Sequence, residues 1–103
     1  MEATVITRIW HGRTKAEHAD EYLRFLIAGV PDYKRISGNR SVEIWREIEG
    51  DVCHFWTVTK WESLDSIKQF AGEDYTKAKY YPEDEKYLIE FEPNVRHCET
   101  FEF

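Results

Sequence analysis

The sequence predicts an α+β fold: a ferredoxin-like, four-stranded antiparallel sheet with its helices on one face. Three observations predict it. Four segments have strand-like patterns, two amphipathic helical segments lie between them, and a turn at residues 49–51 joins the two middle strands as a hairpin. The order is therefore strand, helix, strand, strand, helix, strand, and we expect residues 1–103 to form one such domain.

The first strand and the first helix are predicted within residues 3–30. β-Branched and aromatic residues fill residues 3–11, and Gly12 is expected to end the strand. Thr14 and Glu17 have the spacing of a capping box, in which both side chains hydrogen-bond to free backbone amides at a helix start. Apolar residues then recur every three or four positions, which predicts a helix packed against the sheet: Ala19, Tyr22, Leu23, Leu26 and Val30.

The two hairpin strands are predicted at residues 40–49 and 52–61. The first alternates apolar and polar residues, and the second is rich in aromatic and β-branched residues. Gly50 supplies the turn between them. Ser63 is expected to cap a second helix, and Gly72 stands where a left-handed residue would end that helix.

A further helix and the last strand are predicted within residues 73–103. Residues 73–80 are compatible with a helix, and Pro82 followed by acidic residues is typical of a helix start. Pro93 is expected to end that helix. Apolar and polar residues alternate over residues 94–103, which predicts the fourth strand.

The third strand also predicts an oligomer. Bulky apolar residues occupy both of its faces, with Cys53, Phe55 and Trp61 on one face and Val52, Trp56 and Val58 on the other. The helices can cover only one face of the sheet, so something else must cover the second face. A second copy of the same sheet is the simplest cover, and we therefore expect a homodimer.

Charge and composition exclude several classes of partner. Twenty acidic residues against fourteen basic ones give a net charge of -6, and no stripe of Lys or Arg could follow a phosphate backbone, so we expect no nucleic-acid partner. The sequence has no run of about eighteen apolar residues and no targeting pattern at its start, so we expect no membrane partner and a cytoplasmic location.

Five short segments occur in an order that is found in one family. They are Ser-Gly-Asn at 37–39, Val-Thr-Lys-Trp-Glu-Ser at 58–63, Phe-Ala-Gly-Glu-Asp at 70–74, Ala-Lys-Tyr-Tyr-Pro-Glu-Asp at 78–84 and Val-Arg-His at 95–97. Over nearly the whole chain this set resembles the antibiotic biosynthesis monooxygenase family of dimeric α/β-barrel proteins. The resemblance implies the ferredoxin-like fold, a homodimer and an oxidoreductase activity, that of a monooxygenase.

One branch of that family can be compared residue by residue. Members that oxidise polycyclic phenols without a cofactor have a Trp at the end of the third strand, an Asn four residues before it and a Tyr six residues after it. Trp61 matches the Trp, whereas Thr57 and Ile67 occupy the other two places. The resemblance to this branch therefore rests on Trp61.

Haem-degrading relatives form a second branch. They share the same Trp and also use an Asn in the first strand and a His after the second helix, where this chain has Thr7 and Lys79 or Tyr80. Because the iron ligand is missing, haem degradation is not expected, and we expect no cofactor. The four His residues are dispersed, without the short spacing of a metal site, so no metal is expected: His11, His18, His54 and His97.

His54 and Trp61 are the candidate catalytic residues. Cofactor-free oxygenation needs a base and an apolar shell, because the deprotonated substrate itself supplies the electron to oxygen. His54 lies in a strand among aromatic residues, and imidazole is a suitable base near neutral pH. The alternative interpretation is a hydrogen-bonded histidine in the core or at the dimer interface.

Four further residues are candidates for substrate binding, because flat rings stack on flat substrates and polar tips orient them: Trp56, Tyr75, Tyr80 and His97. Their alternative role is core packing, which is the interpretation favoured for Trp56. The sequence therefore predicts a cofactor-independent monooxygenase acting on a small aromatic or quinol-like molecule. The alternative is a non-catalytic dimer that binds a hydrophobic ligand or has a stress-related role.

Overall fold

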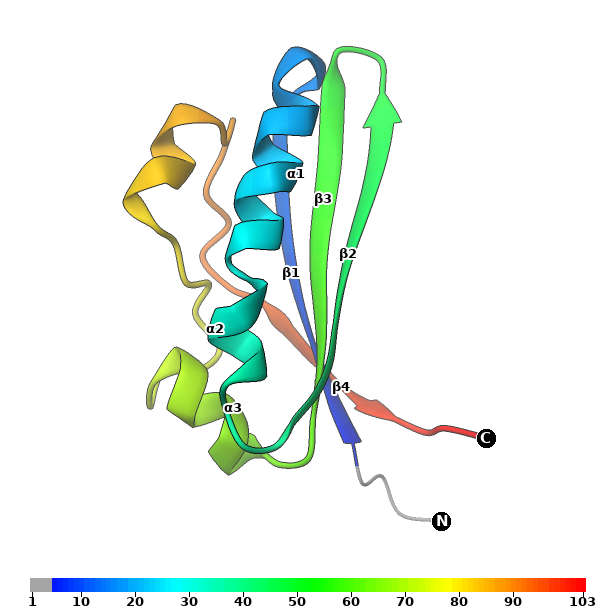
Figure 1. Cartoon of the computed structure of the whole chain (residues 1–103), viewed down its shortest axis with the longest axis vertical. Helices are drawn as coiled ribbons and strands as arrows, with labels where there is room; N and C mark the ends of the chain where they lie inside the picture. Colours follow the sequence, from blue (N-terminus) through cyan, green and yellow to red (C-terminus); the bar gives the residue numbers. More distant parts are fainter. Residues whose placement is uncertain (1–4) are drawn as a thin grey trace.

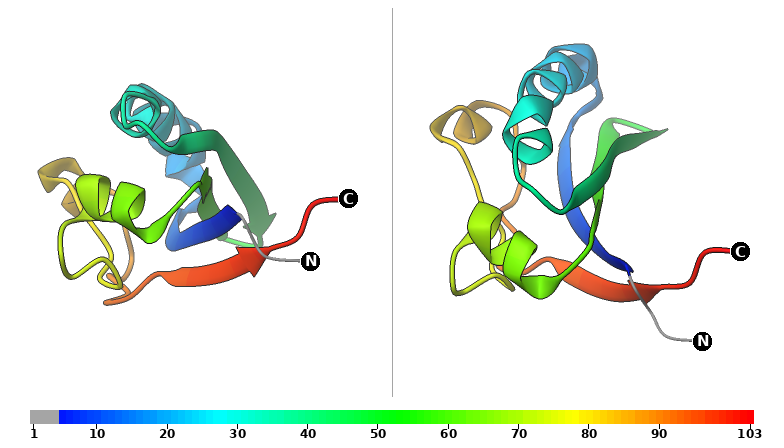
Figure 2. Two further views of the ribbon diagram at one scale, coloured as in Figure 1. Left: turned by 90° about the horizontal axis from the view of Figure 1, so that it is seen from below. Right: turned by 60° about the horizontal axis from the view of Figure 1, so that its bottom comes forward.

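The computed structural model describes residues 5–103, which form a four-stranded antiparallel sheet in the order β2-β3-β1-β4. All helices lie on one side of this sheet (Figures 1 and 2). The elements are β1 (Val5–Lys15), the 3-10 helix η1 (Ala16–His18), α1 (Ala19–Ala28), α2 (Val30–Lys34), β2 (Asn39–Glu49), β3 (Val52–Trp61), α3 (Leu64–Ala71), the 3-10 helix η2 (Pro82–Lys86) and β4 (Arg96–Thr100). This arrangement confirms the predicted ferredoxin-like fold.

The first strand extends further past residue 11 than predicted, and the predicted capping box does not form; the predicted start of the strand at residues 3 and 4 lies outside the described residues. β1 continues past Gly12 to Lys15, because its ladder with β3 extends to the pair Lys15 and Val52. Thr14 is fully buried and its hydroxyl donates to the Lys15 carbonyl instead of capping a helix. Gly12 lies within the strand, paired with Phe55, and the Trp10 ring occupies the space that a Cβ at Gly12 would need. Strand pairing therefore overrides the local helix signal.

The helical segment that follows has the predicted apolar face. Ala19 and Tyr22 of α1 are buried against the sheet, and Leu23 and Leu26 pack around them. The helix ends at the predicted weak point near Gly29, after which α2 continues as a separate short helix.

The hairpin and the second helix confirm the predictions made from local signals. β3 has the predicted bounds, and Gly50 makes the turn before it with φ 61°. The Ser63 hydroxyl accepts a hydrogen bond from the Ser66 amide at 3.1 Å and so caps α3. Gly72 ends α3 with φ 88°, a conformation that favours glycine.

The segment between α3 and β4 is mostly irregular, contrary to prediction. Residues 73–80 form no helix, and the helix opened by Pro82 is only the 3-10 turn η2, which ends long before Pro93. Backbone bonds explain this, because the Ala78 amide donates to the Pro93 carbonyl and the two ends of the segment are held together in extended form. β4 is likewise shorter than the predicted residues 94–103.

The helices cover one face of the sheet and leave the other face without a helix. On the helix side, Cys53, Phe55 and Trp61 of β3 are fully buried. The opposite face, here called the open face, carries Trp56 and Val58 of β3 and their β2 neighbours, and no helix lies over it (Figure 2). The residues of β2 and β3 therefore lie on the faces that the alternation in the sequence predicts.

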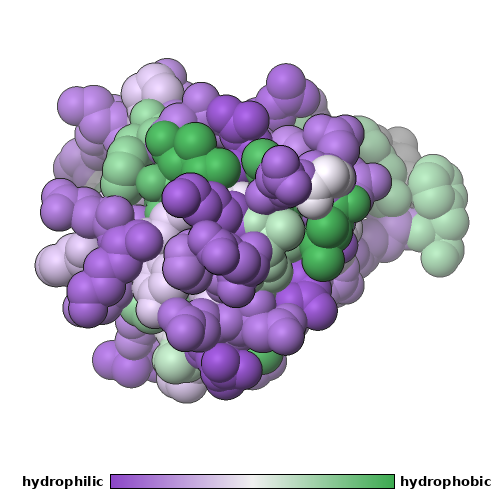
Figure 3. Space-filling model, turned by 90° about the horizontal axis from the view of Figure 1, so that it is seen from above, coloured by the Kyte–Doolittle hydropathy of each residue, from purple (hydrophilic) through white to green (hydrophobic). Residues whose placement is uncertain are grey.

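The end of the molecule that carries the β2–β3 turn has a mainly hydrophilic surface. Hydrophobic groups there are separated into small patches (Figure 3). None of the helices formed by residues 5–103 is long and apolar enough to cross a membrane.

Candidate functional site

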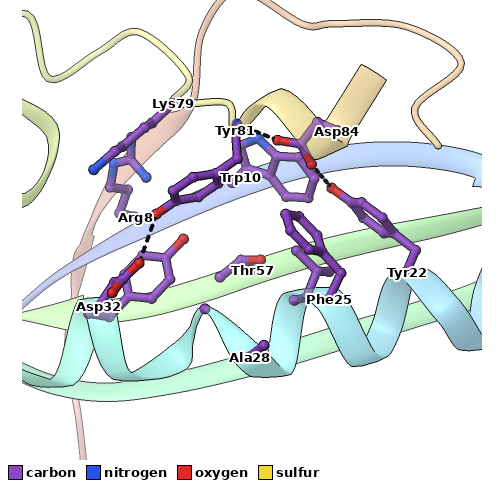
Figure 4. A pocket seen from close by; sticks show the side chains of 13 residues that line it. Arg8, Trp10, Tyr22, Phe25, Ala28, Asp32, Thr57, Lys79, Tyr81 and Asp84 are labelled. Atoms are coloured by element: carbon purple, nitrogen blue, oxygen red, sulfur yellow. Dashed lines mark hydrogen bonds between the residues drawn. The ribbon is translucent and has the colours of Figure 1, made fainter. Parts of the chain in front are cut away.

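A cavity of about 210 Å³ lies between the helices and the sheet. Its floor is formed by β1 and β3, one wall by α1 and α2, and the other by the segment around residues 79–84 (Figure 4). Much of the lining is aromatic or aliphatic: Trp10, Tyr22, Phe25, Leu26, Tyr33 and Tyr81. Such a lining suits a flat apolar molecule.

The aromatic rings of the lining hold one another in place. The rings of Phe25 and Tyr81 meet edge to face across the cavity walls, with centroids 6.2 Å apart and planes at 82°. The Trp10 ring lies 6.5 Å from the Tyr22 ring in a tilted arrangement. These ring pairs have the separations and angles at which aromatic side chains attract one another, so they help to hold the cavity walls together.

Asp84 ties the two walls together at one end of the cavity. It is 3% exposed and accepts a hydrogen bond from the Tyr22 hydroxyl at 2.7 Å. Its other oxygen accepts from the Tyr81 amide, also at 2.7 Å. Burial, together with this bond to Asp84, raises the pKa of Tyr22. Asp84 is therefore a structural acceptor whose two oxygens both have partners.

Two cations, Arg8 and Lys79, lie together at the other end (Figure 4). Arg8 is 2% exposed, and its Nη2 donates only to the Lys77 carbonyl at 3.3 Å. Its guanidinium lies 5.5 Å from the centre of the Phe70 ring. Burial lowers the pKa of Arg8, since the charged form loses hydration.

Lys79 lies beside Arg8, but it is exposed to solvent. Its Nζ lies 4.3 Å from the centre of the Phe70 ring and donates to the Phe70 carbonyl at 3.3 Å. Neither Lys79 nor Arg8 forms an ion pair with any carboxylate of residues 5–103. The two cations at this end of the cavity are therefore not ion-paired within the described residues.

Tyr33 and Asp32 complete the cationic end. The Tyr33 ring stacks on Phe70 with centroids 4.3 Å apart. Burial raises the pKa of Tyr33 to about 12, although the charge of Arg8 opposes that rise. Asp32 accepts hydrogen bonds from Arg35 at 2.9 Å and from the Tyr81 hydroxyl at 3.3 Å, so it is already engaged.

His54 and Trp56, predicted for catalysis and substrate binding, lie on the open face of the sheet and not at the cavity. Their rings stack with centroids 5.7 Å apart and planes at 16°. His54 also bonds to His11 through ring nitrogens 2.9 Å apart. Across residues 5–103, no three His, Cys, Asp or Glu side chains are grouped so that they could hold a metal ion.

Trp61, the other predicted catalytic residue, lies on the helix side in a second core cluster. It is fully buried with Ile67 and Phe70, and its indole donates to the Thr59 hydroxyl at 2.8 Å. This hydrogen bond satisfies its only polar group.

The three remaining candidates lie on the helix side, away from the cavity lining. Tyr75 and His97 meet edge to face with ring centroids 5.2 Å apart, and burial lowers the pKa of His97. Tyr80 packs against Trp10 and donates to the Glu92 carbonyl at 2.6 Å. The six predicted site residues therefore fall into separate groups, and none of them lines the cavity.

The cavity residues that sequence reasoning missed include Arg8, Tyr33, Lys79 and Tyr81. Arg8 carried a detectable signal, because it occupies the same face of β1 as Trp10 and that face is otherwise buried. A charged residue in the core-facing phase of a strand is rare unless it is paired or functional. Tyr33 lies in a helix with no distinguishing local pattern, whereas Lys79 and Tyr81 lie in the segment 78–84 that contributes to the family resemblance.

Comparisons with known proteins support the fold. No protein-family model matches the sequence, and no curated protein matches it. A conserved protein from Methanosarcina mazei Go1 is similar in structure, with a TM-score of 0.71 and 14% identity over 96% of this chain and 95% of that chain.

Two further solved structures bear the provisional name antibiotic biosynthesis monooxygenase. The one from Nitrosomonas europaea has a TM-score of 0.72 and 10% identity, covering 97% of this chain and 93% of that chain. The one from Bordetella bronchiseptica has a TM-score of 0.67 and 18% identity, covering 95% and 98%. These likenesses confirm the fold that the family resemblance implies.

Proposed function

We propose that the protein is a cofactor-independent monooxygenase that acts on a small aromatic or quinol-like substrate held in the cavity over β1 and β3. The observation that carries this proposal is the aromatic lining of the cavity, with the cations Arg8 and Lys79 at one end. The fold shared with proteins named as monooxygenases supports it. Aromatic walls would bind the ring system, and the cations would favour an ionised form of the substrate.

In this reaction the deprotonated substrate transfers an electron to oxygen. A ring methylene becomes a carbonyl: one oxygen atom of O₂ enters the product, and the other leaves as water with the two hydrogens of the methylene. The positive charge of Arg8 and Lys79 would stabilise the intermediate anion. Asp32 is the cavity carboxylate with access to solvent, and we assign to it the transfer of the substrate proton to water. His54 lies on the opposite face of the sheet and cannot contact a substrate in this cavity.

Oxygen uptake with anthrone and a set of quinols tests the proposal. Leu26 faces the cavity, whereas the next residue, Ile27, is 53% exposed on the outer side of α1. Leu26→Trp should fill the cavity and lower turnover at least about tenfold. Ile27→Trp is the matched control and should leave turnover unchanged. Absence of oxygen uptake across the set, or equal activity of both variants, would contradict the proposal.

We also propose that the active form is a homodimer in which the open faces of two sheets pack together. The support is apolar surface on that face, where Trp45 of β2 is 49% exposed beside Trp56. In solution the particle should have twice the chain mass of 12.4 kDa. Trp45→Glu should give monomers, and Ile27→Glu on the helix side should not. A wild-type monomer at micromolar concentration would contradict this assembly.

Binding without catalysis is the second candidate, and one observation favours it. Both cavity carboxylates, Asp32 and Asp84, already accept hydrogen bonds, and within residues 5–103 no histidine lines the cavity. Native mass spectrometry of protein purified from cells separates the two functions. A co-purified hydrophobic ligand that is not oxidised in air would favour the binding protein.

A further inference from the structure

We infer that the ligand of this cavity is an aromatic carboxylate, whose carboxylate group is held on the sheet floor by Arg8 and Thr57. This inference deepens the proposed function and rests on it only in placing the ligand in the same cavity. It names a substrate class that the fold does not specify, because the likeness to other structures extends to the backbone arrangement alone.

The first step is that Arg8 has unused hydrogen-bonding capacity. Its Nε is fully buried and has no partner among residues 5–103. Its Nη2 reaches only a backbone carbonyl, that of Lys77. A buried guanidinium normally pairs with a carboxylate, because the cost of removing the charge from water is otherwise uncompensated. Arg8 therefore lacks an anionic partner, and it faces a cavity.

The second step is that Thr57 has an unused hydroxyl on the same floor. Its Oγ1 is buried without a hydrogen-bond partner in the described part of the chain, and the residue is 4% exposed. Thr57 pairs with Trp10 in the ladder, and Arg8 pairs with Thr59, so Arg8 and Thr57 are diagonal neighbours on one face. Side chains at such positions reach the same ligand group.

The acids of the cavity do not neutralise this end. Asp84 accepts from Tyr22 and from the Tyr81 amide, at the opposite end of the cavity from Arg8. Asp32 is bonded to Arg35 and to the Tyr81 hydroxyl. The unpaired groups of the floor are thus donors, and Lys79 adds a second positive charge beside Arg8 (Figure 4).

A carboxylate fits these donors better than a phenolate does. It has two oxygens, so it can accept from Arg8 Nε and from Thr57 Oγ1 at the same time, whereas a phenolate offers one oxygen. The ring attached to it would lie among Trp10, Phe25 and Tyr81, which form the aromatic part of the lining. A carboxylate also carries its charge at neutral pH without help from a protein base.

The test is titration calorimetry of the full chain with naphthoate, naphthamide and naphthol, in buffer without oxygen. Naphthoate should bind at least about tenfold more tightly than its neutral isostere naphthamide, and more tightly than naphthol. Arg8→Met should abolish the preference for naphthoate, and Thr57→Val should reduce it about threefold to tenfold. Arg24→Gln, a change on the exposed side of α1, should leave it unchanged.

The thermal stability of the free protein gives an independent readout. Arg8→Met removes a buried charge without a partner, so the ligand-free variant should melt at the same temperature as the wild type or higher. Equal binding of naphthoate and naphthamide, tighter binding of naphthol, or a naphthoate preference that survives in Arg8→Met would each overturn the inference. A clear preference for naphthoate without oxygen uptake by any substrate would instead refute the monooxygenase while leaving the carboxylate site intact.

Discussion

The ring nitrogens His11 Nε2 and His54 Nδ1 lie 2.9 Å apart on the open face of the sheet, where they link β1 to β3. The same His11 ring bonds to Glu92 through Nδ1, and His54 Nε2 lies 3.5 Å from the Glu49 carboxylate. A chain of four polar groups therefore crosses this face. In the central bond one ring nitrogen donates and the other accepts.

Substitution of these histidines should reveal their coupling. His54→Phe keeps a ring to stack on Trp56 but removes the bond to His11, and should lower the free energy of unfolding by about 1 kcal/mol. The double variant His11→Phe/His54→Phe should cost less than the sum of the single variants. Urea unfolding at fixed protein concentration measures the free energy of unfolding of each variant. His18→Phe is the control at a more exposed histidine, and strictly additive effects would show that the bond contributes nothing.

The sequence predicts the parts of this fold that depend on short-range chemistry. Gly50 and Ser63 act as predicted, because a tight turn and a helix cap involve only neighbouring residues. Thr14 misleads for the opposite reason. Thr14 and Glu17 have the local sequence pattern of a capping box, yet the partner strand β3 continues alongside Thr14 as far as Val52 and holds it in extended form.

The candidate site is harder to predict, because its residues come from three distant segments. Arg8 and Thr57 become diagonal neighbours only through the register of β1 against β3, and Tyr81 joins the cavity lining from a loop whose sequence has no periodic pattern. His54 shows the same difficulty in reverse. Its aromatic neighbours in the sequence suggest a pocket, but alternation along the strand places it on the face opposite to Phe55.

Gly12 of β1 should not tolerate replacement by a residue that has a Cβ atom. A Cβ at this position would lie 2.5 Å from the Trp10 ring and 3.0 Å from Leu88. Gly12→Ala should therefore displace the Trp10 ring at the cavity floor and lower the free energy of unfolding by about 1 to 3 kcal/mol. Gly29→Ala is the matched control, since its Cβ would meet only the Leu26 carbonyl at 3.5 Å. Chemical denaturation measures the free energy of unfolding of both variants. Equal values would contradict the close contact at Gly12.

Tyr33 should contribute to unfolding at alkaline pH. Its pKa is raised by burial to about 12 in the folded state, against about 10 in an unfolded chain. Below pH 10 the phenol is neutral in both states and the stability is fully present. As the pH rises from about 10 to 12 the unfolded state loses its proton first, so the stability falls.

The variant that tests this is Tyr33→Phe, which removes the ionisable group and keeps the ring that stacks on Phe70. Between pH 10 and 12 it should lose about 1 to 2 kcal/mol less stability than the wild type, while the two proteins should be alike near pH 7. Denaturant titrations across the alkaline range measure the difference. Tyr75→Phe, at a ring that packs against His97 outside the cavity lining, is the control. Parallel stability curves for Tyr33→Phe and wild type would show that Tyr33 is not protected from ionisation.

Asp84 should be the most sensitive polar residue of the cavity. Asp84→Ala leaves the Tyr22 hydroxyl and the Tyr81 amide without their acceptor in a buried place, and should lower the free energy of unfolding by about 2 to 4 kcal/mol. Tyr22→Phe loses one bond and should cost about 1 to 2 kcal/mol. Because both changes remove the same bond, the double variant should cost less than their sum. Full additivity in denaturant titrations would mean that this bond does not hold η2 against α1.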